Sequence, residues 1–148
     1  MASTVSPPTV ATLVTRSIVL DATRCWRDAR DSRRPVQPAL FQALAVHRCG
    51  LLTPAIDSLL QLFEKCTGRR FRTGARGQAG LSGDEQQLLD LLAGPERAET
   101  VPLDTAANPR LARAMRTALR SARIMLRLAL EPGDHIPSSP QLRMLVAV

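Results

Sequence analysis

The chain of 148 residues carries a formal net charge of +7, and its length predicts a single domain that can bury a core of its own. No run of 18 or more apolar residues occurs, so the sequence predicts no membrane-spanning helix. Three widely spaced cysteines are an odd number and argue against a secreted disulfide scaffold. We therefore expect an intracellular, cytoplasmic protein, or a nuclear one if its source is eukaryotic or viral.

The chain begins with a Ser/Thr-rich stretch that contains no acidic residue. We expect residues 1–9 to be a disordered leader, and the same composition is compatible with a cleaved organelle transit segment. Apolar residues then recur at helical spacing and predict a first helix over residues 10–30. Trp26, the only tryptophan, is expected to anchor the core.

Two short helices are predicted next, over residues 38–49 and 54–66. Gly50 is expected to end the first at its C-terminal side, and Thr53-Pro54 to cap and start the second. This order resembles a helix-turn-helix, but the face of the second helix that we expect to be exposed offers an acid and no arginine to a polyanion. We therefore favour a plain helical hairpin, with this exposed face formed by Pro54, Asp57, Ser58 and Gln61.

Residues 68–80 form a basic Gly/Arg loop with no acidic residue. One interpretation is a flexible surface loop. The other is an anion-binding loop in which Phe71 stacks on a ligand and the arginines bind it. The candidate binding residues of this loop are Arg69, Arg70, Arg72 and Arg76.

A capping box precedes the next predicted helix, over residues 83–93. The hydroxyl of Ser82 and the carboxylate of Glu85 are placed to satisfy two free backbone amides reciprocally. A polar linker follows. After the last helix, residues 132–148 are predicted to be a Pro-rich, extended tail whose apolar end, from Leu142 to Val148, could dock or bind a partner.

The last predicted helix, over residues 109–130, has Asn108 as its N-cap and Pro109 at its first position. It has an apolar stripe, a flank of arginines and no acidic residue. The preceding segment, residues 82–108, has a net charge of −5, so it competes with any external anion for these arginines. The six arginines of this helix are Arg110, Arg113, Arg116, Arg120, Arg123 and Arg127.

Motifs that carry chemistry are absent from the sequence. It contains neither a GxSxG nucleophile motif nor an HExxH zinc motif. His47, Cys49 and Cys66 would supply three metal ligands, but no second close pair accompanies them. We expect no catalytic residues, no metal and no cofactor, and therefore a protein that is not an enzyme.

Together these observations predict an all-α, single-domain bundle of about five helices, with residues 10–131 as the helical domain. We expect a regulatory or interaction protein that binds an acidic protein partner through the basic loop and through Arg113, Arg116 and Arg120. The alternative is a nucleic-acid-binding protein that uses the same arginines on phosphates. A third interpretation places the last helix on a membrane surface. The sequence leaves the oligomeric state open.

Overall fold

The structure is a computed structural model that describes residues 9–75, 77–93 and 108–131. No β-strand occurs within these ranges, so the prediction of an all-α fold with about five helices is confirmed. The predicted tail and, apart from Thr9, the predicted leader lie outside the described residues. The helices are α1 (Val10–Asp31), α2 (Val36–Ala45), α3 (Thr53–Thr67), α4 (Gly83–Ala93) and α5 (Pro109–Leu130), with a 3-10 turn, η1 (Gly50–Leu52), before α3.

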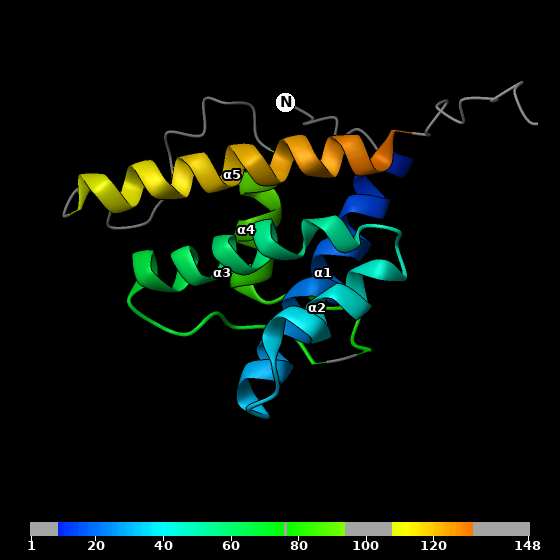
Figure 1. Ribbon diagram of the computed structural model, residues 1–148, viewed down its shortest axis with the longest axis horizontal. Coiled ribbons are helices and arrows are strands. Elements are labelled where there is room, and N and C mark those ends of the chain that lie inside the picture. The colour runs from blue at the N-terminus through cyan, green and yellow to red at the C-terminus, as the bar shows by residue number, and fades with distance from the viewer. Residues whose placement is uncertain (1–8, 76, 94–107, 132–148) are drawn as a thin grey trace, which may run out of the picture.

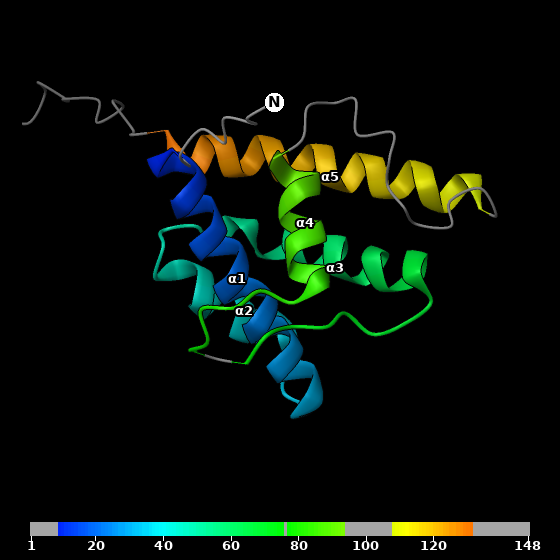
Figure 2. The same ribbon diagram turned by 180° about the vertical axis from the view of Figure 1, so that it is seen from behind.

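Helices α3 and α5 lie side by side (Figure 1 and Figure 2). Helices α1 and α4 run across this pair, and α2 packs along α1. The start of α1 lies next to the end of α5. The space between the helices is filled by side chains that are almost completely buried, among them Trp26, Leu40, Leu44, Leu59, Leu60, Phe63, Leu88 and Met115.

Three helix ends follow the local signals of the sequence. Asn108 caps α5, since its Oδ1 accepts a hydrogen bond from the backbone N–H of Leu111 at 3.1 Å. The capping box of α4 is formed: Ser82 Oγ accepts from the Glu85 N–H at 3.1 Å, and the Glu85 carboxylate accepts from the Ser82 N–H at 2.9 Å. Gly68 ends α3 in the left-handed conformation, with φ of 66°.

The predicted end of the second helix at Gly50 is wrong. Helix α2 stops at Ala45, and Arg48 takes the left-handed conformation (φ 59°) that terminates the following turn. Gly50 instead opens η1, where a Cβ atom would lie 2.6 Å from the ring of Phe41. A side chain at Gly50 would therefore require the half-exposed ring of Phe41 to move. The hydroxyl of Thr53 does not cap α3 either, because it donates back to the Gly50 carbonyl at 2.7 Å.

The exposed face predicted for α3 also needs correction at Asp57. Pro54, Ser58 and Gln61 are exposed, but Asp57 is buried. Its Oδ1 accepts the indole N–H of Trp26 at 2.8 Å and the Gln61 amide at 3.0 Å, and its Oδ2 accepts the amide of Gln37. Trp26 is completely buried, as predicted for a core anchor, and its indole N–H needs an acceptor there. Asp57 therefore faces the core because it satisfies that donor.

Candidate interaction surface

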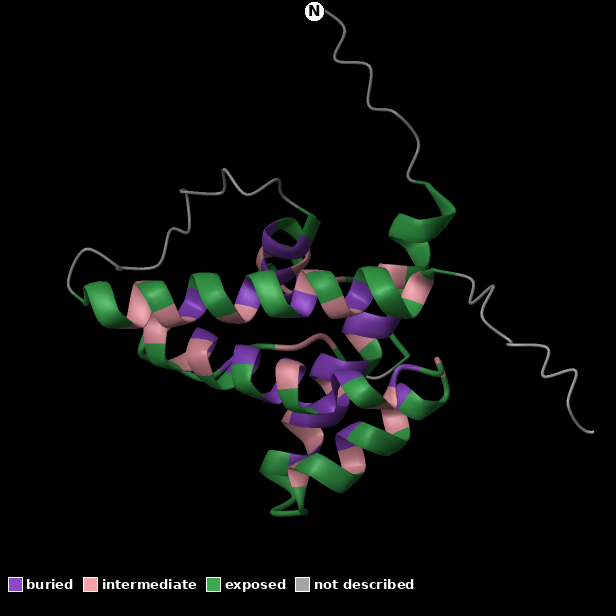
Figure 3. Cartoon of the chain, turned by 45° about the horizontal axis from the view of Figure 1, so that its top comes forward, coloured by how far each residue is buried: buried purple, intermediate pink, exposed green. Residues whose placement is uncertain are grey.

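The surface of interest is the exposed side of α5. The opposite side of the helix is buried against α3 and α4 through Met115, Leu119, Ala122 and Leu126. Figure 3 shows buried and intermediate residues along one side of α5 and exposed residues along the other, over its whole length. The strongly amphipathic sequence of this helix is thus explained by packing inside the domain, and its basic side remains in solvent.

Five of the six arginines of α5 are exposed, and the predicted site residues Arg113, Arg116 and Arg120 are among them. The sixth, Arg123, is half-buried and donates from Nε to the carbonyl of Leu91, near the C-terminus of α4, at 3.1 Å. A guanidinium at this position is stabilised by the negative end of the α4 dipole. Within the described residues, no arginine of α5 forms an ion pair.

Several arginines outside α5 form ion pairs within the chain. Six arginines each pair with a carboxylate of the same chain at 3.2 Å or less, whereas Arg16, Arg33, Arg48 and Arg72 are exposed and form no ion pair with the described residues. Arg27 and Arg30 of α1 additionally lie over the ring of Trp26, with their guanidinium carbons 5.4 and 4.5 Å from the ring centroid. The six paired arginines outside α5 form the ion pairs Arg24–Glu85, Arg27–Glu64, Arg30–Glu64, Arg34–Asp28, Arg69–Asp84 and Arg70–Asp31.

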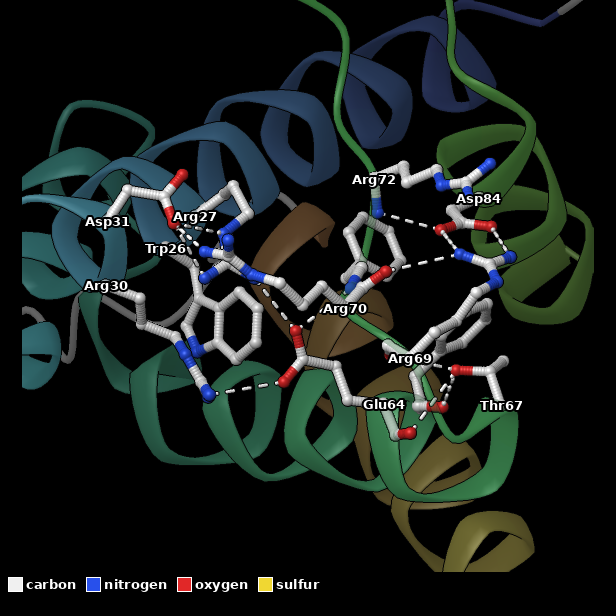
Figure 4. A network of polar contacts seen from close by, with 12 residues as sticks. Trp26, Arg27, Arg30, Asp31, Glu64, Thr67, Arg69, Arg70, Arg72 and Asp84 are labelled. Carbon is white, nitrogen blue, oxygen red and sulfur yellow. Dashed lines mark hydrogen bonds and ion pairs between the residues drawn. The ribbon is translucent and has the colours of Figure 1, made fainter.

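The basic loop is attached to the domain at its first residues, as the close-up in Figure 4 shows. Phe71 is not available to stack on a ligand, because its ring is buried and meets Phe63 edge-to-face with centroids 5.0 Å apart. The backbone N–H of Phe71 donates to Glu64 at 2.9 Å. Arg69 holds Asp84 with two hydrogen bonds of 2.7 Å.

The other predicted loop arginines differ in their surroundings. Arg70 pairs with Asp31 at the end of α1, and Arg72 is exposed while its backbone N–H donates to Asp84 at 2.7 Å. Arg76 lies outside the described residues. Of the three loop arginines that the structure describes, Arg69 and Arg70 are therefore paired with carboxylates of the same chain.

The two predicted basic surfaces are not brought together. Figure 1 and Figure 2 both place the loop over residues 68–80 on one side of α3 and helix α5 on its other side. A single small partner site would therefore not contain both the loop arginines and those of α5.

An ion pair with a buried carboxylate closes the far end of the loop. Glu85 is completely buried, and its carboxylate accepts from Arg24 Nε at 2.9 Å. The same guanidinium donates to the carbonyls of Gln78 and Gly80 at 2.9 and 3.0 Å. A Cβ atom at Gly74 would lie 2.8 Å from this guanidinium, so the absence of a side chain there lets the loop close around Arg24.

Both acidic residues at the start of α4 have lowered pKa values. For Asp84, the hydrogen bonds from Arg69 lower the pKa, with further help from the Arg72 N–H against the opposing effect of burial. For Glu85, burial is the largest influence and raises the pKa, but the hydrogen bonds from Arg24, Ser82 and Gly74 together outweigh it. In both cases the native state favours the carboxylate over the protonated acid.

We expect the domain to lose stability in acid as a direct result. A carboxyl group whose pKa is lower in the folded than in the unfolded chain stabilises the fold fully above its ordinary pKa, here 3.8 for Asp84 and 4.5 for Glu85. This contribution disappears as the pH falls through the folded-state values. Urea denaturation between pH 7 and pH 3 should show that the free energy of unfolding decreases once the pH is below about 4.5.

The Asp84→Asn/Glu85→Gln variant should be less stable at pH 7, and its free energy of unfolding should depend less on pH. An equally steep dependence on pH would contradict the assignment.

A groove of about 490 Å³ lies where the start of α1, the helix α4 and the end of α5 meet. Leu92 and Leu126 are its most buried apolar residues, and Leu81, Leu89 and Leu130 are half-buried around them. Arg16 and Arg127 stand exposed at its edge. The remaining lining residues are Ala11, Thr12, Thr15, Gln86, Asp90, Ala93 and Arg123.

The sequence reasoning did not identify this groove, although a signal was present. The core side of α1 presents Ile18, Val19 and Ala22 once the helix is inside the domain. Two turns earlier the same side carries the small residues Ala11 and Thr15, too small to fill the space against two leucine-rich helices. A change from large to small residues along one helix face indicates where packing ends.

Groups that could support catalysis or hold a metal ion are few. Among the residues that the structure describes, no three His, Cys, Asp or Glu side chains are grouped so that they could hold a metal. His47 Nε2 contacts Asp21 at 2.7 Å, and the thiol of Cys49 donates to the His47 carbonyl at 3.2 Å. Burial raises the pKa of the Cys49 and Cys66 thiols, which makes them weaker nucleophiles at neutral pH.

Comparison with known proteins finds no match to a family model, to a curated protein or to a solved structure. Among the described helices, none is long and apolar enough to cross a membrane.

Proposed function

We propose that this protein is a non-enzymatic interaction module that binds an acidic protein partner through the exposed arginines Arg113, Arg116 and Arg120 of α5. One observation carries the proposal. These arginines face solvent without an acidic partner among the described residues, whereas the arginines between the helices are paired with carboxylates of the same chain.

The geometry of the three arginines suits a protein partner. With spacings of three and four residues they lie on one side of a straight helix, and a rise of 1.5 Å per residue gives them a span of about 10 Å. Carboxylates at similar spacing on a partner helix can face all three. Arginine is enriched at protein interfaces because its planar guanidinium forms two parallel hydrogen bonds with a carboxylate.

Two features favour a protein over nucleic acid. The exposed face of α3, the second helix of the predicted helical hairpin, carries Pro54, Ser58 and Gln61 and offers no arginine to a phosphate backbone. In addition, the groove at the end of α5 offers leucines beside Arg127, and apolar surface of that kind serves side chains better than phosphates.

The acidic segment over residues 82–108 is the internal competitor for these arginines. In its described part, Asp84 and Glu85 are already committed to Arg69 and Arg24. Glu96, Glu99 and Asp104 lie outside the described residues. If those acids do occupy the α5 arginines in the free protein, the Glu96→Gln/Glu99→Gln/Asp104→Asn variant will bind an acidic partner more tightly than the natural chain.

The test compares two triple variants that lose the same charge. Arg113→Gln/Arg116→Gln/Arg120→Gln removes the proposed surface, and Arg33→Gln/Arg48→Gln/Lys65→Gln removes three exposed cations outside both predicted basic surfaces. Partners are captured from cell extract with and without nuclease, identified, purified and titrated against each variant. We expect the α5 variant to weaken binding at least tenfold without lowering its melting temperature, and the control to bind nearly as well as the natural chain.

The other outcomes separate the alternatives. Capture that nuclease abolishes, with an affinity that falls steeply with salt, would establish nucleic acid as the ligand. Full binding by the α5 variant would place the partner on another surface. A matching loss of melting temperature and binding would mean that these arginines stabilise the fold instead.

A further inference from the structure

The groove between α1, α4 and α5 remains open because the side chains that face it from α1 are small. Ala11 takes the place that Ile18 occupies two turns further along the same helix, and Thr15 lies one turn beyond Ala11 on that side. The opposite walls are leucine-rich, with Leu89 and Leu92 from α4 and Leu126 from α5. A volume of about 490 Å³ lies within the range of sites that hold a ligand or several inserted side chains.

The charged residues of the groove are mainly basic. Arg16 and Arg127 are exposed and form no ion pair with the described residues, and Arg123 reaches the Leu91 carbonyl. The single acid of the lining, Asp90, accepts a hydrogen bond from Gln86 at 2.9 Å. An occupant with apolar and acidic groups therefore complements the groove better than one that is only apolar or basic.

The groove also continues the proposed interaction surface. Arg127 is seven residues beyond Arg120 on the same flank of α5, which corresponds to about 10 Å along the helix axis. A chain segment that fills the groove can extend along α5 toward Arg113 without leaving the basic side of that helix.

We propose that the groove binds an acidic, amphipathic helix of the partner protein. Its apolar residues, at spacings of three and four, insert between α1, α4 and α5, and its acidic residues face Arg16 and Arg127. This inference rests on the proposed function, because it names the part of the partner that the α5 arginines meet. The mixture of leucine walls and arginine edges is the reason for choosing this class of ligand over a phosphate-rich polymer.

The probe is a synthetic, fluorescently labelled 18-residue peptide with leucines at positions i, i+3, i+4 and i+7 and glutamates elsewhere. Its control has the same composition in an order that destroys the helical period. Titration followed by fluorescence anisotropy should show saturable one-to-one binding of the amphipathic peptide and at least tenfold weaker binding of the scrambled one. Binding of both peptides with equal affinity would overturn the proposal, since charge alone would then explain it.

Groove variants locate the site on the protein. Thr15→Phe fills the groove, and Val14→Phe places the same ring on the adjacent exposed position that does not line it. We expect Thr15→Phe to lower the affinity for the amphipathic peptide at least tenfold, and Val14→Phe to change that affinity by less than twofold. If Thr15→Phe lowers the melting temperature, Ala11→Trp replaces it in the test, because Ala11 also lines the groove but is exposed. Unchanged binding by both groove variants would overturn the proposal.

The α5 variant and the groove variant also show which of the two proposals fails. Loss of binding in Arg113→Gln/Arg116→Gln/Arg120→Gln alone supports the α5 surface and rejects the groove, whereas loss in Thr15→Phe alone supports the groove and rejects that surface. A chain ending at Glu131 tests whether residues 132–148 of the same chain occupy the groove. If this truncation makes the amphipathic peptide bind at least tenfold more tightly, and a synthetic peptide of residues 132–148 displaces it, the chain's own tail fills the groove and the proposal is wrong.

Discussion

Replacing Arg24 by methionine is expected to lower the free energy of unfolding by about 3–5 kcal/mol, the usual effect of removing one partner from a buried ion pair. Glu85 is completely buried, and Arg24 provides its only ion pair among the described residues. Methionine fills a similar volume but leaves the Glu85 carboxylate without a counter-charge. It also abolishes the hydrogen bonds to the carbonyls of Gln78 and Gly80, which close the basic loop.

Urea denaturation followed by circular dichroism measures this effect. The control is Arg34→Met, because Arg34 pairs with Asp28 while both side chains remain about half exposed, and such surface pairs contribute about 0–1 kcal/mol. Adding Glu85→Gln to Arg24→Met should recover part of the loss, since glutamine can keep the capping hydrogen bond without burying a charge. A loss in Arg24→Met no larger than in the control would show that the Glu85 carboxylate is hydrated in solution.

Replacing Phe71 by alanine is expected to cost about 3–5 kcal/mol, as for other fully buried aromatic residues. Only 1% of Phe71 is exposed, and its ring packs edge-to-face on Phe63 from within the basic loop. The cavity would remove the apolar attachment of the loop. We therefore also expect trypsin to cut after Arg69, Arg70 and Arg72 much faster in the variant than in the natural chain.

Denaturation midpoints and the rate of tryptic cleavage under native conditions check this prediction. Phe41→Ala provides the comparison, because half of that phenylalanine is exposed and its loss should cost less than half as much. If the natural protein were cut in the loop as rapidly as the Phe71→Ala variant, the loop would open readily in solution and its packing would contribute little.

Helix positions could be predicted from the sequence because their signals are local. A cap such as Asn108 or Ser82 bonds to a backbone amide three residues away, and the apolar period of α5 is contained in the helix itself. The burial of Asp57 could not be predicted, for the opposite reason. Its burial depends on the Trp26 indole, 31 positions earlier in the chain, and nothing in the sequence around Asp57 indicates that donor.

The candidate site could be predicted only in part. The exposure of Arg113, Arg116 and Arg120 follows from the helical period of α5. The pairing of Arg69 with Asp84 and of Arg70 with Asp31 joins residues 15 and 39 positions apart, so it required the tertiary structure. The small residues Ala11 and Thr15 indicate where the packing of α1 ends, but the groove itself depends on the relative positions of three helices, which the sequence does not give.

The exclusive use of arginine in the ion pairs around the loop has a consequence for alkaline conditions. The hydrogen bonds with Glu85 and Asp84 raise the pKa of Arg24 and Arg69 above an already high ordinary value, so both stay protonated in strongly basic solution. The same guanidinium groups do not react with amine-directed reagents. Lys65 is the only lysine of the chain and is exposed on α3. Amine-coupled dyes or surfaces can therefore be attached there while every charge that holds the loop, and every arginine of α5, is left intact.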